Sequence, residues 1–488
     1  MAIRTTYMLA VLAILMVAPV LAAGTTVEVS VDCGNVLDTA PVLWGHVNVS
    51  RRAPPPPELC ALIRREFGLP TVTRCWLLLD QMWDYRTNTY RFDYEINKDY
   101  YVGDPKKKKY GVQGVTTGLR YYQYIDSVAR HSQHVLLNIR RYEPEVLAGM
   151  VPLTKWKEVF KAAVRHYKKR CPNLRYIEVL NEPTAKNQSN IGSMKNYYRF
   201  YRVAYQAINE LNAELKPRLP LLVGGTSGFR TDHAIHLARD FANDTAANKR
   251  LDFLSFHHYW AGGRPAQVAE WEGQVDRALA RLKLPTDLPI FVTEIGYAHD
   301  YKDNPAKNHW QACGMTAYQY YARQSPNLRL FPWVQYHSKK QIAFVQFDTD
   351  LTMTPYGAAV KMLRMHRSRE VNAHSNGVDK NGNGVNAIAT IDDAGLTVQV
   401  WNLEPTGKTS ALTRVSVKKR PADLRKGRLV VRRYLIDSKH SNHLMNRKWA
   451  GGLQLVETFE LDGAAELSLN AKLEPMAICL WEVNRKKN

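Results

Sequence analysis

Two glutamates follow apolar, strand-like runs that lie far apart in this chain of 488 residues. The run 176–180 is followed by Asn-Glu-Pro, which contains Glu182, and the run 288–293 is followed directly by Glu294. Two carboxylates brought together suit glycoside hydrolysis. A protonated one donates to the leaving oxygen, and an ionised one attacks the anomeric carbon or activates water. An Asn-Glu dipeptide alone also occurs in turns and helix caps, so the prediction depends on both strand ends.

The elements that must position this pair are eight β-rich runs, which alternate with helical patterns over residues 40–369. The predicted strands are 42–45, 71–76, 134–139, 176–180, 220–224, 251–257, 288–293 and 328–335. The predicted helices are 58–67, 118–131, 154–170, 194–215, 232–242, 266–282, 309–323 and 355–367. This alternation predicts an α/β fold, the (β/α)8 TIM barrel. A doubly wound open sheet is the alternative, but the sequence lacks the Gly-rich turn that it requires after the first strand.

The predicted barrel brings the two glutamates to one cleft, because active sites of this fold lie at the carboxyl ends of the strands. Strands four and seven lie across the barrel mouth from each other. Strict two-residue alternation puts Glu178, Leu180 and Glu182 on one face of the fourth strand, and Val292 and Glu294 on one face of the seventh. Glu178 lies further inside and is predicted to be paired with a cation, since an unpaired buried charge is costly.

The chain outside the barrel contains a second domain. Residues 370–488 have no helical pattern and contain short alternating runs at 395–402, 412–417, 429–436, 464–469 and 476–483, typical of an antiparallel β-sandwich. Residues 24–39 include a similar alternation at 26–31, which is predicted to pair with this C-terminal sheet.

Residues 1–23 have the pattern of a secretory signal peptide, with Arg4 before an apolar run and small residues at the end. We therefore expect an exported protein, secreted or periplasmic, without a membrane span after cleavage. An N-terminal membrane anchor is the alternative, although the run is short for a span.

The composition excludes some classes of function. A hydrophobic content of 45% excludes intrinsic disorder. The chain has 67 Lys and Arg against 45 Asp and Glu, a net charge of +22 that is spread over both predicted domains. The one dense basic run is Lys106–Lys109, and no nucleic-acid-binding motif accompanies it, so no nucleic acid partner is expected. The expected partner is a carbohydrate, and the charge leaves an acidic polysaccharide as one candidate.

No metal and no cofactor are predicted. The six cysteines are scattered without the spacing of a zinc site, and their pairing and the oligomeric state are left open. The sequence Asp379-x-Asn381-x-Asn383-Gly384 begins like a calcium loop but lacks the closing glutamate, so a β-hairpin is the preferred interpretation.

The chain resembles clan A glycoside hydrolases, and most of all family 39, the family of β-xylosidases and α-L-iduronidases. The best stretches are 176–183, 253–259 and 291–294. The resemblance implies that Glu182 is the general acid/base and Glu294 the nucleophile of a retaining reaction, with carboxyls about 5–5.5 Å apart. The family usually has an aromatic residue where Leu180 stands, and a histidine where Trp76 stands, so these two positions depart from its pattern.

Three further residues are expected to support the carboxylates. Arg74 ends the second strand and could keep Glu294 ionised through its charge, unless it is a surface arginine. His257 and Tyr259 share a face of the sixth strand and could hydrogen-bond the nucleophile or the sugar, unless the histidine is only a core residue. The neighbouring His258 faces the opposite way, which argues against a metal-binding pair.

Other candidates are expected to contact the sugar. Asn181 resembles the clan asparagine that hydrogen-bonds the sugar 2-hydroxyl, and its alternative is a turn residue. Trp333 ends the eighth strand and resembles the aromatic platform of clan A enzymes, with ordinary core packing as its alternative. Further aromatic candidates at the rim are Trp44, Trp76, Tyr297 and Trp260.

The sequence therefore predicts a retaining glycoside hydrolase that cleaves an oligo- or polysaccharide. Two alternatives use the same scaffold. One is a non-catalytic carbohydrate-binding or envelope protein, and the other is a transglycosylase that shares the same residues. Activity on a glycan panel separates the first from a hydrolase, and product analysis with acceptor sugars separates the second.

Overall fold

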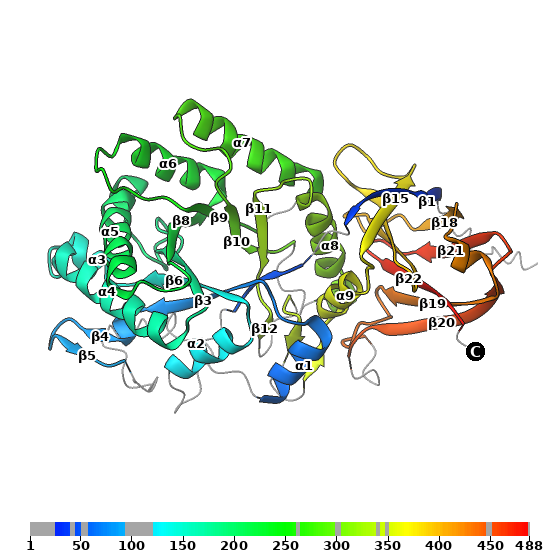
Figure 1. The fold of residues 1–488 in the computed structure, drawn as a ribbon, viewed down its shortest axis with the longest axis horizontal. Helices are drawn as coiled ribbons and strands as arrows, with labels where there is room; N and C mark the ends of the chain where they lie inside the picture. Colours follow the sequence, from blue (N-terminus) through cyan, green and yellow to red (C-terminus); the bar gives the residue numbers. More distant parts are fainter. Residues whose placement is uncertain are drawn as a thin grey trace, which may run out of the picture.

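The computed structural model describes residues 25–39, 44–49, 57–92, 121–259, 264–297, 304–337, 342–346, 351–445 and 451–486. Eight parallel strands hydrogen-bond in the order β11-β10-β9-β8-β7-β6-β3-β2. The sheet closes because β2 contacts β11, where Asn48 bridges Trp333. The predicted (β/α)8 barrel is therefore confirmed (Figure 1).

The barrel strands are β2 (His46–Asn48), β3 (Val72–Leu78), β6 (His134–Arg140), β7 (Leu174–Val179), β8 (Leu222–Phe229), β9 (Phe253–His258), β10 (Ile290–Ile295) and β11 (Leu328–Pro332). The helices are α1 (Pro57–Phe67), α2 (Tyr121–Arg130), α3 (Glu143–Leu147), α4 (Leu153–Arg170), α5 (Tyr197–Leu215), α6 (Arg230–Asn243), α7 (Val268–Arg281), α8 (Trp310–Ala322) and α9 (Pro355–Arg364). Short strands outside the barrel are β4 (Trp83–Asp84), β5 (Thr89–Tyr90), β12 (Tyr336–His337), β13 (Val345–Gln346) and β14 (Thr352–Met353).

Two of the predicted strands differ from the structure. The first barrel strand is β2, whereas the run 42–45 is not a strand at its described positions 44 and 45. The fifth strand continues through Gly224 to Phe229, because glycines there pair with the neighbouring strand instead of ending the sheet. The predicted basic run 106–109 lies outside the described residues.

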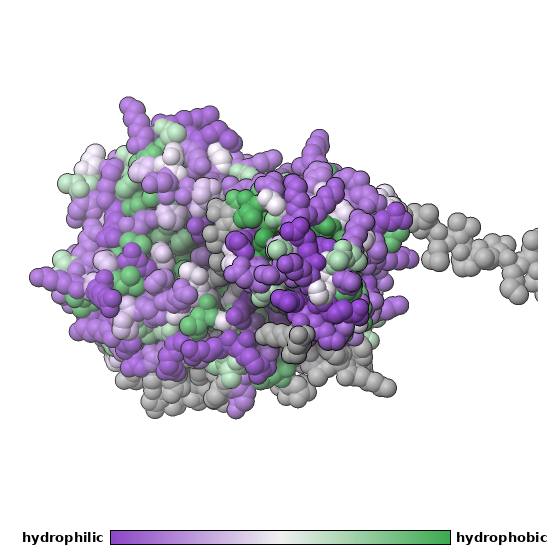
Figure 2. All heavy atoms as spheres, turned by 45° about the vertical axis from the view of Figure 1, so that its right-hand side comes forward, coloured by the Kyte–Doolittle hydropathy of each residue, from purple (hydrophilic) through white to green (hydrophobic). Residues whose placement is uncertain are grey.

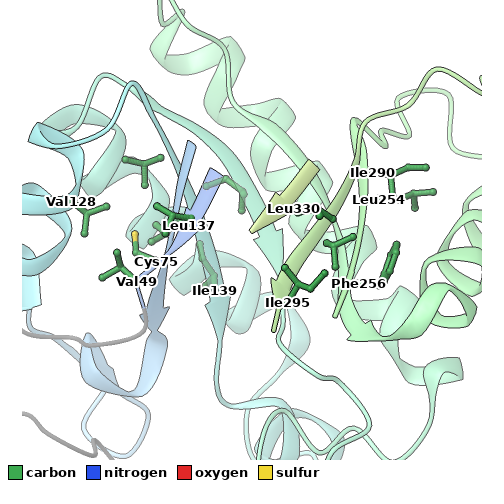
Figure 3. Close-up of a cluster of buried hydrophobic side chains, with 14 of the residues drawn as sticks. Val49, Cys75, Val128, Leu137, Ile139, Leu254, Phe256, Ile290, Ile295 and Leu330 are labelled. Carbon is green, nitrogen blue, oxygen red and sulfur yellow. The ribbon is translucent and has the colours of Figure 1, made fainter. Parts of the chain in front are cut away.

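Two apolar layers hold the barrel together. A small interior cluster includes Phe253, Phe291 and Phe331, with Phe253 and Phe291 stacked at 4.9 Å between ring centroids. A much larger cluster fills the space between the strands and the helices. Figure 3 shows part of it, including Ile290 and Ile295 of β10. The interior aromatic cluster forms a floor below the polar groups at the barrel mouth.

The second domain is a nine-stranded sheet with the order β20-β19-β22-β17-β16-β15-β1-β18-β21. Its strands are β1 (Thr25–Thr39), β15 (Arg369–Ser375), β16 (Gly384–Ile391), β17 (Gly395–Leu403), β18 (Ala411–Lys418), β19 (Arg428–Ile436), β20 (Gln454–Asp462), β21 (Leu467–Leu473) and β22 (Ile478–Arg485). The sheet folds over a core of its own, because β21 at one end also contacts β22. One pair, β1 with β18, is parallel, so the domain is not purely antiparallel as predicted.

The two domains are packed against each other through α8 and α9 (Figure 1). Tyr320 of α8 meets Trp401 of β17 edge-on, with ring centroids 5.0 Å apart. Hydrophilic side chains cover most of the face in Figure 2. Within the described ranges, no helix has the length and apolar character needed to cross a membrane.

The hairpin between β15 and β16 explains the calcium-like motif. Asp379 Oδ1 accepts the backbone N–H groups of Asn381 and Asn383 at 2.8 and 2.9 Å, so the carboxylate serves the turn itself. None of the six cysteines, all of which are described and buried, forms a disulfide.

Candidate active site

Arg74, a fully buried residue of β3, joins the polar groups at the barrel mouth. Its Nε donates to Glu178 Oε2 and its Nη1 donates to Glu294 Oε1, both at 2.7 Å. Its Nη2 donates to Asn181 Oδ1 at 2.6 Å and to Ser227 Oγ at 2.8 Å. The predicted ion pair with Glu294 is present, and one guanidinium connects four strands of the barrel through directed hydrogen bonds.

Glu178 lies below the two strand-end glutamates and is fully buried. Besides Arg74, Asn138 Nδ2 and Thr293 Oγ1 donate to its carboxylate, each at 2.8 Å. Burial raises the pKa of Glu178. The charges of Arg74 and His257, together with hydrogen bonds, lower it by more, so the pKa lies below its usual value. The structural carboxylate predicted from the sequence is therefore an ionised partner of Arg74.

Glu294 ends β10 with a carboxylate that is held on both oxygens. Arg74 binds Oε1, and the hydroxyl of Tyr259 donates to Oε2. The side chain is only 6% exposed. Burial raises the pKa of Glu294, and His257, Arg74 and the Tyr259 hydrogen bond lower it by more, so the group is held ionised.

Glu182 follows β7 and keeps a partly exposed carboxylate, whose side chain is 12% exposed. Its Oε1 lies 3.2 Å from Nδ1 of the buried His257, and His257 Nε2 lies 2.8 Å from Ser227 Oγ. The Ser227 hydroxyl donates to Asn181 Oδ1 at 3.1 Å, so its oxygen accepts from Nε2. Nδ1 therefore faces Glu182 and can share a proton with it.

The two candidate catalytic carboxylates approach each other closely. One oxygen of Glu182, one of Glu294 and a ring nitrogen of His257 all lie within 4.8 Å of one another. These three residues are the one group in the described part of the chain whose ligand types could hold a metal ion. However, Arg74 and Tyr259 already occupy both oxygens of Glu294, which leaves few free lone pairs for an ion. The arrangement fits proton transfer and nucleophilic attack better.

Local breaks in regular backbone bring these groups together. Leu180, Glu182 and Ser227 have positive φ values of 60°, 43° and 54°, so strict alternation ends at the carboxyl ends of β7 and β8. In β10 the register shifts between Val292 and Glu294, which is a β-bulge.

The predicted shared faces are therefore right for Glu178 and Glu182 and wrong for Leu180 and Val292. Val292 and Leu180 pack in the layer between strands and helices, whereas Glu178, Glu182 and Glu294 belong to the barrel mouth. The bulge and the left-handed residues turn the glutamates inward.

Two further predicted site residues, Asn181 and Trp333, differ in their surroundings. Asn181 is buried, with Oδ1 held by Arg74 and Nδ2 3.4 Å from Gln188 Oε1. Trp333 is half-buried beside β2 and β10, and its indole N–H lacks a hydrogen-bond partner in the described part of the protein.

Tyr297 is the residue whose placement differs most from the expectation. It is nine-tenths buried against α8, where a Cβ on Gly314 would overlap its ring. It belongs to the apolar layer between the strands and the helices, so its ring serves packing rather than the rim. Of the other rim candidates, Trp44 is half-buried and Trp260 lies outside the described residues.

Sequence reasoning missed two polar residues of the site. Ser227 was hidden because the glycines before it suggested the end of a strand. Asn138 stands two positions after Leu136, so it is a polar residue on the inward face of an otherwise apolar strand, and this signal could have been found. Trp76, one of the predicted rim candidates, lies beside this site. Its ring packs under the guanidinium groups of Arg74 and Arg140, at 5.8 and 4.7 Å.

A comparison with known proteins finds a family match in the middle of the chain. Residues 147–318 match the model of glycosyl hydrolases family 39, so the predicted resemblance is confirmed. A family 39 enzyme from Xanthomonas axonopodis pv. citri is 13% identical and superposes with a TM-score of 0.67 over 95% of this chain and 98% of its own.

Two other solved structures have a similar fold. A monomeric β-xylosidase from Caulobacter crescentus CB15 is also 13% identical, with a TM-score of 0.66 over 94% of this chain and all of its own. An α-L-arabinofuranosidase from Thermotoga maritima gives a TM-score of 0.61 at 13% identity, with 94% of this chain and all of its own covered. These likenesses establish the shared architecture.

Proposed function

We propose that this chain, a glycoside hydrolase of family 39, is a retaining enzyme that cleaves O-glycosidic bonds by double displacement. The observation that supports this proposal is the approach of Glu182 and Glu294, with one oxygen of each within 4.8 Å. Retaining enzymes have carboxyl groups about 5–5.5 Å apart, whereas inverting enzymes need about 6.5–9.5 Å to admit a water between them.

In the first step Glu294 attacks the anomeric carbon and forms a glycosyl-enzyme ester. Glu182 in its protonated form gives its proton to the glycosidic oxygen, and the bond from that oxygen to the anomeric carbon breaks. Arg74 and Tyr259 hold the carboxylate of Glu294 in one orientation, because each binds a different oxygen. A fixed nucleophile lowers the cost of reaching the reactive geometry.

In the second step Glu182, now a carboxylate, takes a proton from water. The resulting hydroxyl attacks the anomeric carbon, the ester to Glu294 breaks, and the sugar leaves with its configuration retained. His257 is placed to orient Glu182 through Nδ1, while Ser227 fixes the other ring nitrogen. Both steps need no group beyond these side chains and water.

The substrate is an oligo- or polysaccharide. The similar structures include a β-xylosidase and an α-L-arabinofuranosidase, so aryl xylosides and arabinofuranosides are the first compounds to test. The panel should continue with neutral polysaccharides and uronic-acid polymers. Proton NMR of the first product formed should show that the anomeric configuration is retained.

Two variants test the roles of the glutamates. Glu294→Gln should abolish turnover of every substrate in the panel. Glu182→Gln should slow natural glycosides more than aryl glycosides with good leaving groups, because the latter need little protonation. Glu158→Gln on the outer face of α4 is the matched control and should keep normal rates. Normal rates in Glu294→Gln, or an inverted product, would contradict the proposal.

We also propose that the protein is exported through residues 1–23, which lie outside the described residues. The pattern of a basic residue, an apolar run and small residues supports this proposal. Fractionation of cells that express the chain with and without these residues tests it. Retention of both forms in the cytoplasm would contradict export.

A further inference from the structure

Two hollows follow one another along α6 and α7, which lie side by side on the outside of the barrel (Figure 1). The first, of about 660 Å³, begins at His257 and Tyr259 of the candidate active site. The second, of about 510 Å³, lies between the two helices. Gln274 of α7 lines both hollows and accepts a hydrogen bond from Thr231 at 2.8 Å. We call this continuous surface the α6–α7 groove.

The lining of the groove is strongly basic. Arg230 and Arg264 line the first hollow, and Arg239, Arg277 and Arg281 line the second. All five arginines are exposed, and none has an ion pair among the described residues. Asp232 is the one carboxylate in the lining of either hollow. The local field is therefore positive and attracts anions.

The neighbouring helix pair, α4 and α5, also carries a row of basic side chains, but there acidic partners neutralise their charge. Between α4 and α5, Lys157 and Lys161 bind Glu210, and Arg165 binds Glu214 through two hydrogen bonds of 2.7 and 2.8 Å. The α6–α7 groove has an equal number of cations in its second hollow. Asp240 and Asp276 lie near Arg239 and Arg277, but no ion pair joins them among the described residues. Its charge is thus available for a ligand.

We propose that the α6–α7 groove binds an acidic polysaccharide, along the part of the chain remote from the bond being cleaved. This inference rests on the proposed function, since the groove begins at its active site. Arginine binds carboxylates and sulfates with paired hydrogen bonds. Phe229, which is 45% exposed in the first hollow, offers a face for a sugar ring near the catalytic groups.

The shape of the groove fits an extended polymer. The helices that form it have 14 residues each, a length of about 20 Å at the usual rise per residue. The second hollow has no aromatic residue in its lining. Proteins that bind single-stranded nucleic acids typically stack the bases on aromatic side chains, so the lining of the second hollow favours a polysaccharide.

Binding is tested in a Glu294→Gln background, so that the outcome does not depend on turnover. Affinity electrophoresis in polygalacturonate and in chondroitin sulfate should show strong retardation, and xylan, a neutral polymer, should show little. The triple variant Arg239→Gln, Arg277→Gln, Arg281→Gln should bind both acidic polymers about tenfold more weakly, because exposed ion contacts each contribute modestly. Raising the salt concentration to about 0.5 M should weaken binding of the parent protein.

A control triple variant removes the same charge elsewhere. Arg199, Arg425 and Lys472 are exposed, lie outside the groove and are each replaced by Gln. This variant should bind acidic polymers within twofold of the parent on the scale of such surface contacts. Thermal unfolding of both triples checks that they fold. If the groove triple proves unfolded, Arg230→Gln with Arg264→Gln replaces it.

Several outcomes would overturn the inference. One is that the groove triple variant binds acidic polymers as tightly as the parent protein. Another is that the control triple variant loses as much affinity as the groove triple variant. A third is that xylan or a single-stranded DNA retards the parent protein as strongly as the acidic polymers do. The inference and the proposed function fail separately. Full activity of Glu294→Gln would refute the mechanism and leave the binding result intact. Unchanged polymer binding by the groove triple would refute the groove and leave the mechanism intact.

Discussion

Replacing Tyr259 with Phe removes a single hydroxyl and keeps the ring in place. That hydroxyl donates to Glu294 Oε2, while Arg74 holds Oε1. Burial raises the pKa of Glu294, and His257, Arg74 and the Tyr259 hydrogen bond together lower it below its usual value. Without the hydroxyl, one of the lowering contributions is lost, so the pKa of Glu294 should rise.

The size of this effect follows from the strength of the bond. A hydrogen bond to a charged group contributes about 1.5–3 kcal/mol, and one pKa unit corresponds to about 1.4 kcal/mol. The pKa of Glu294 should therefore rise by about one to two units in Tyr259→Phe. The nucleophile works as a carboxylate, so activity falls as the pH drops through this pKa. The pH midpoint of the acid limb of the kcat/KM profile should therefore move upward by about the same one to two pH units.

The same bond affects stability. A carboxylate whose pKa is lowered by folding contributes stability above its unfolded pKa, and that contribution is lost as the pH falls through the folded pKa. Tyr259→Phe should therefore lower the free energy of unfolding at neutral pH by up to about 3 kcal/mol and change it little at acid pH.

The assay is the pH profile of kcat/KM on an aryl glycoside that the parent enzyme cleaves. Tyr205→Phe is the matched control, because its hydroxyl also donates to a carboxylate, Asp244 Oδ2, at 2.7 Å, but on the outside of the barrel. The control should keep the parent profile even if it loses stability. An acid limb that stays in place in Tyr259→Phe, with normal folding, would refute the argued role of the hydroxyl.

Two further predictions concern buried charges. Arg74→Met leaves Glu178 and Glu294 buried without their cation, which should cost about 3–5 kcal/mol in urea unfolding. Arg74→Lys should restore little of this loss, since an ammonium lacks the planar fork that makes four contacts, and full restoration would contradict the network. Glu143 is fully buried, and burial raises its pKa to about 7. The contribution of Glu143 to the free energy of unfolding should therefore be largest below pH 4.5, fall as the pH rises to about 7, and then level off. Glu143→Gln should remove this fall and add about 3 kcal/mol at pH 8, measured by unfolding across pH, and an unchanged slope would contradict it.

The barrel and the carboxylate pair could be predicted from sequence because both depend on patterns that repeat. Alternating strand and helix runs specify a barrel, and a barrel specifies which strand ends meet. The family match over residues 147–318 agrees with this interpretation. The predicted ion pair between Arg74 and Glu294 followed from the same logic, since the ends of strands two and seven face one cleft.

The details that sequence could not predict are those where the backbone departs from its regular repeat. Ile290 and Ile295 both belong to the apolar cluster between the strands and the helices, although strict alternation over that odd separation would put them on opposite sides of β10. The bulge before Glu294 explains this. A bulge depends on the register of both neighbouring strands, which no single run of residues reveals. The left-handed backbone of Ser227 could not be predicted from the sequence either, because such positions are usually occupied by glycine and not by serine.

The charge balance of the site connects its structure with the proposed chemistry. Glu178 and Glu294 are both ionised and share one guanidinium, that of Arg74. With Glu182 protonated and donating to Nδ1 of a neutral His257 at the start of the reaction, these groups carry one more negative than positive charge. Glycoside cleavage passes through a transition state with positive charge on the sugar ring. A preorganised, buried negative site stabilises that charge more than it stabilises the neutral substrate, which is the condition for lowering the barrier. Arg74 therefore has two opposing tasks. It must keep both carboxylates ionised in the barrel, and it must leave one negative charge uncompensated for the sugar.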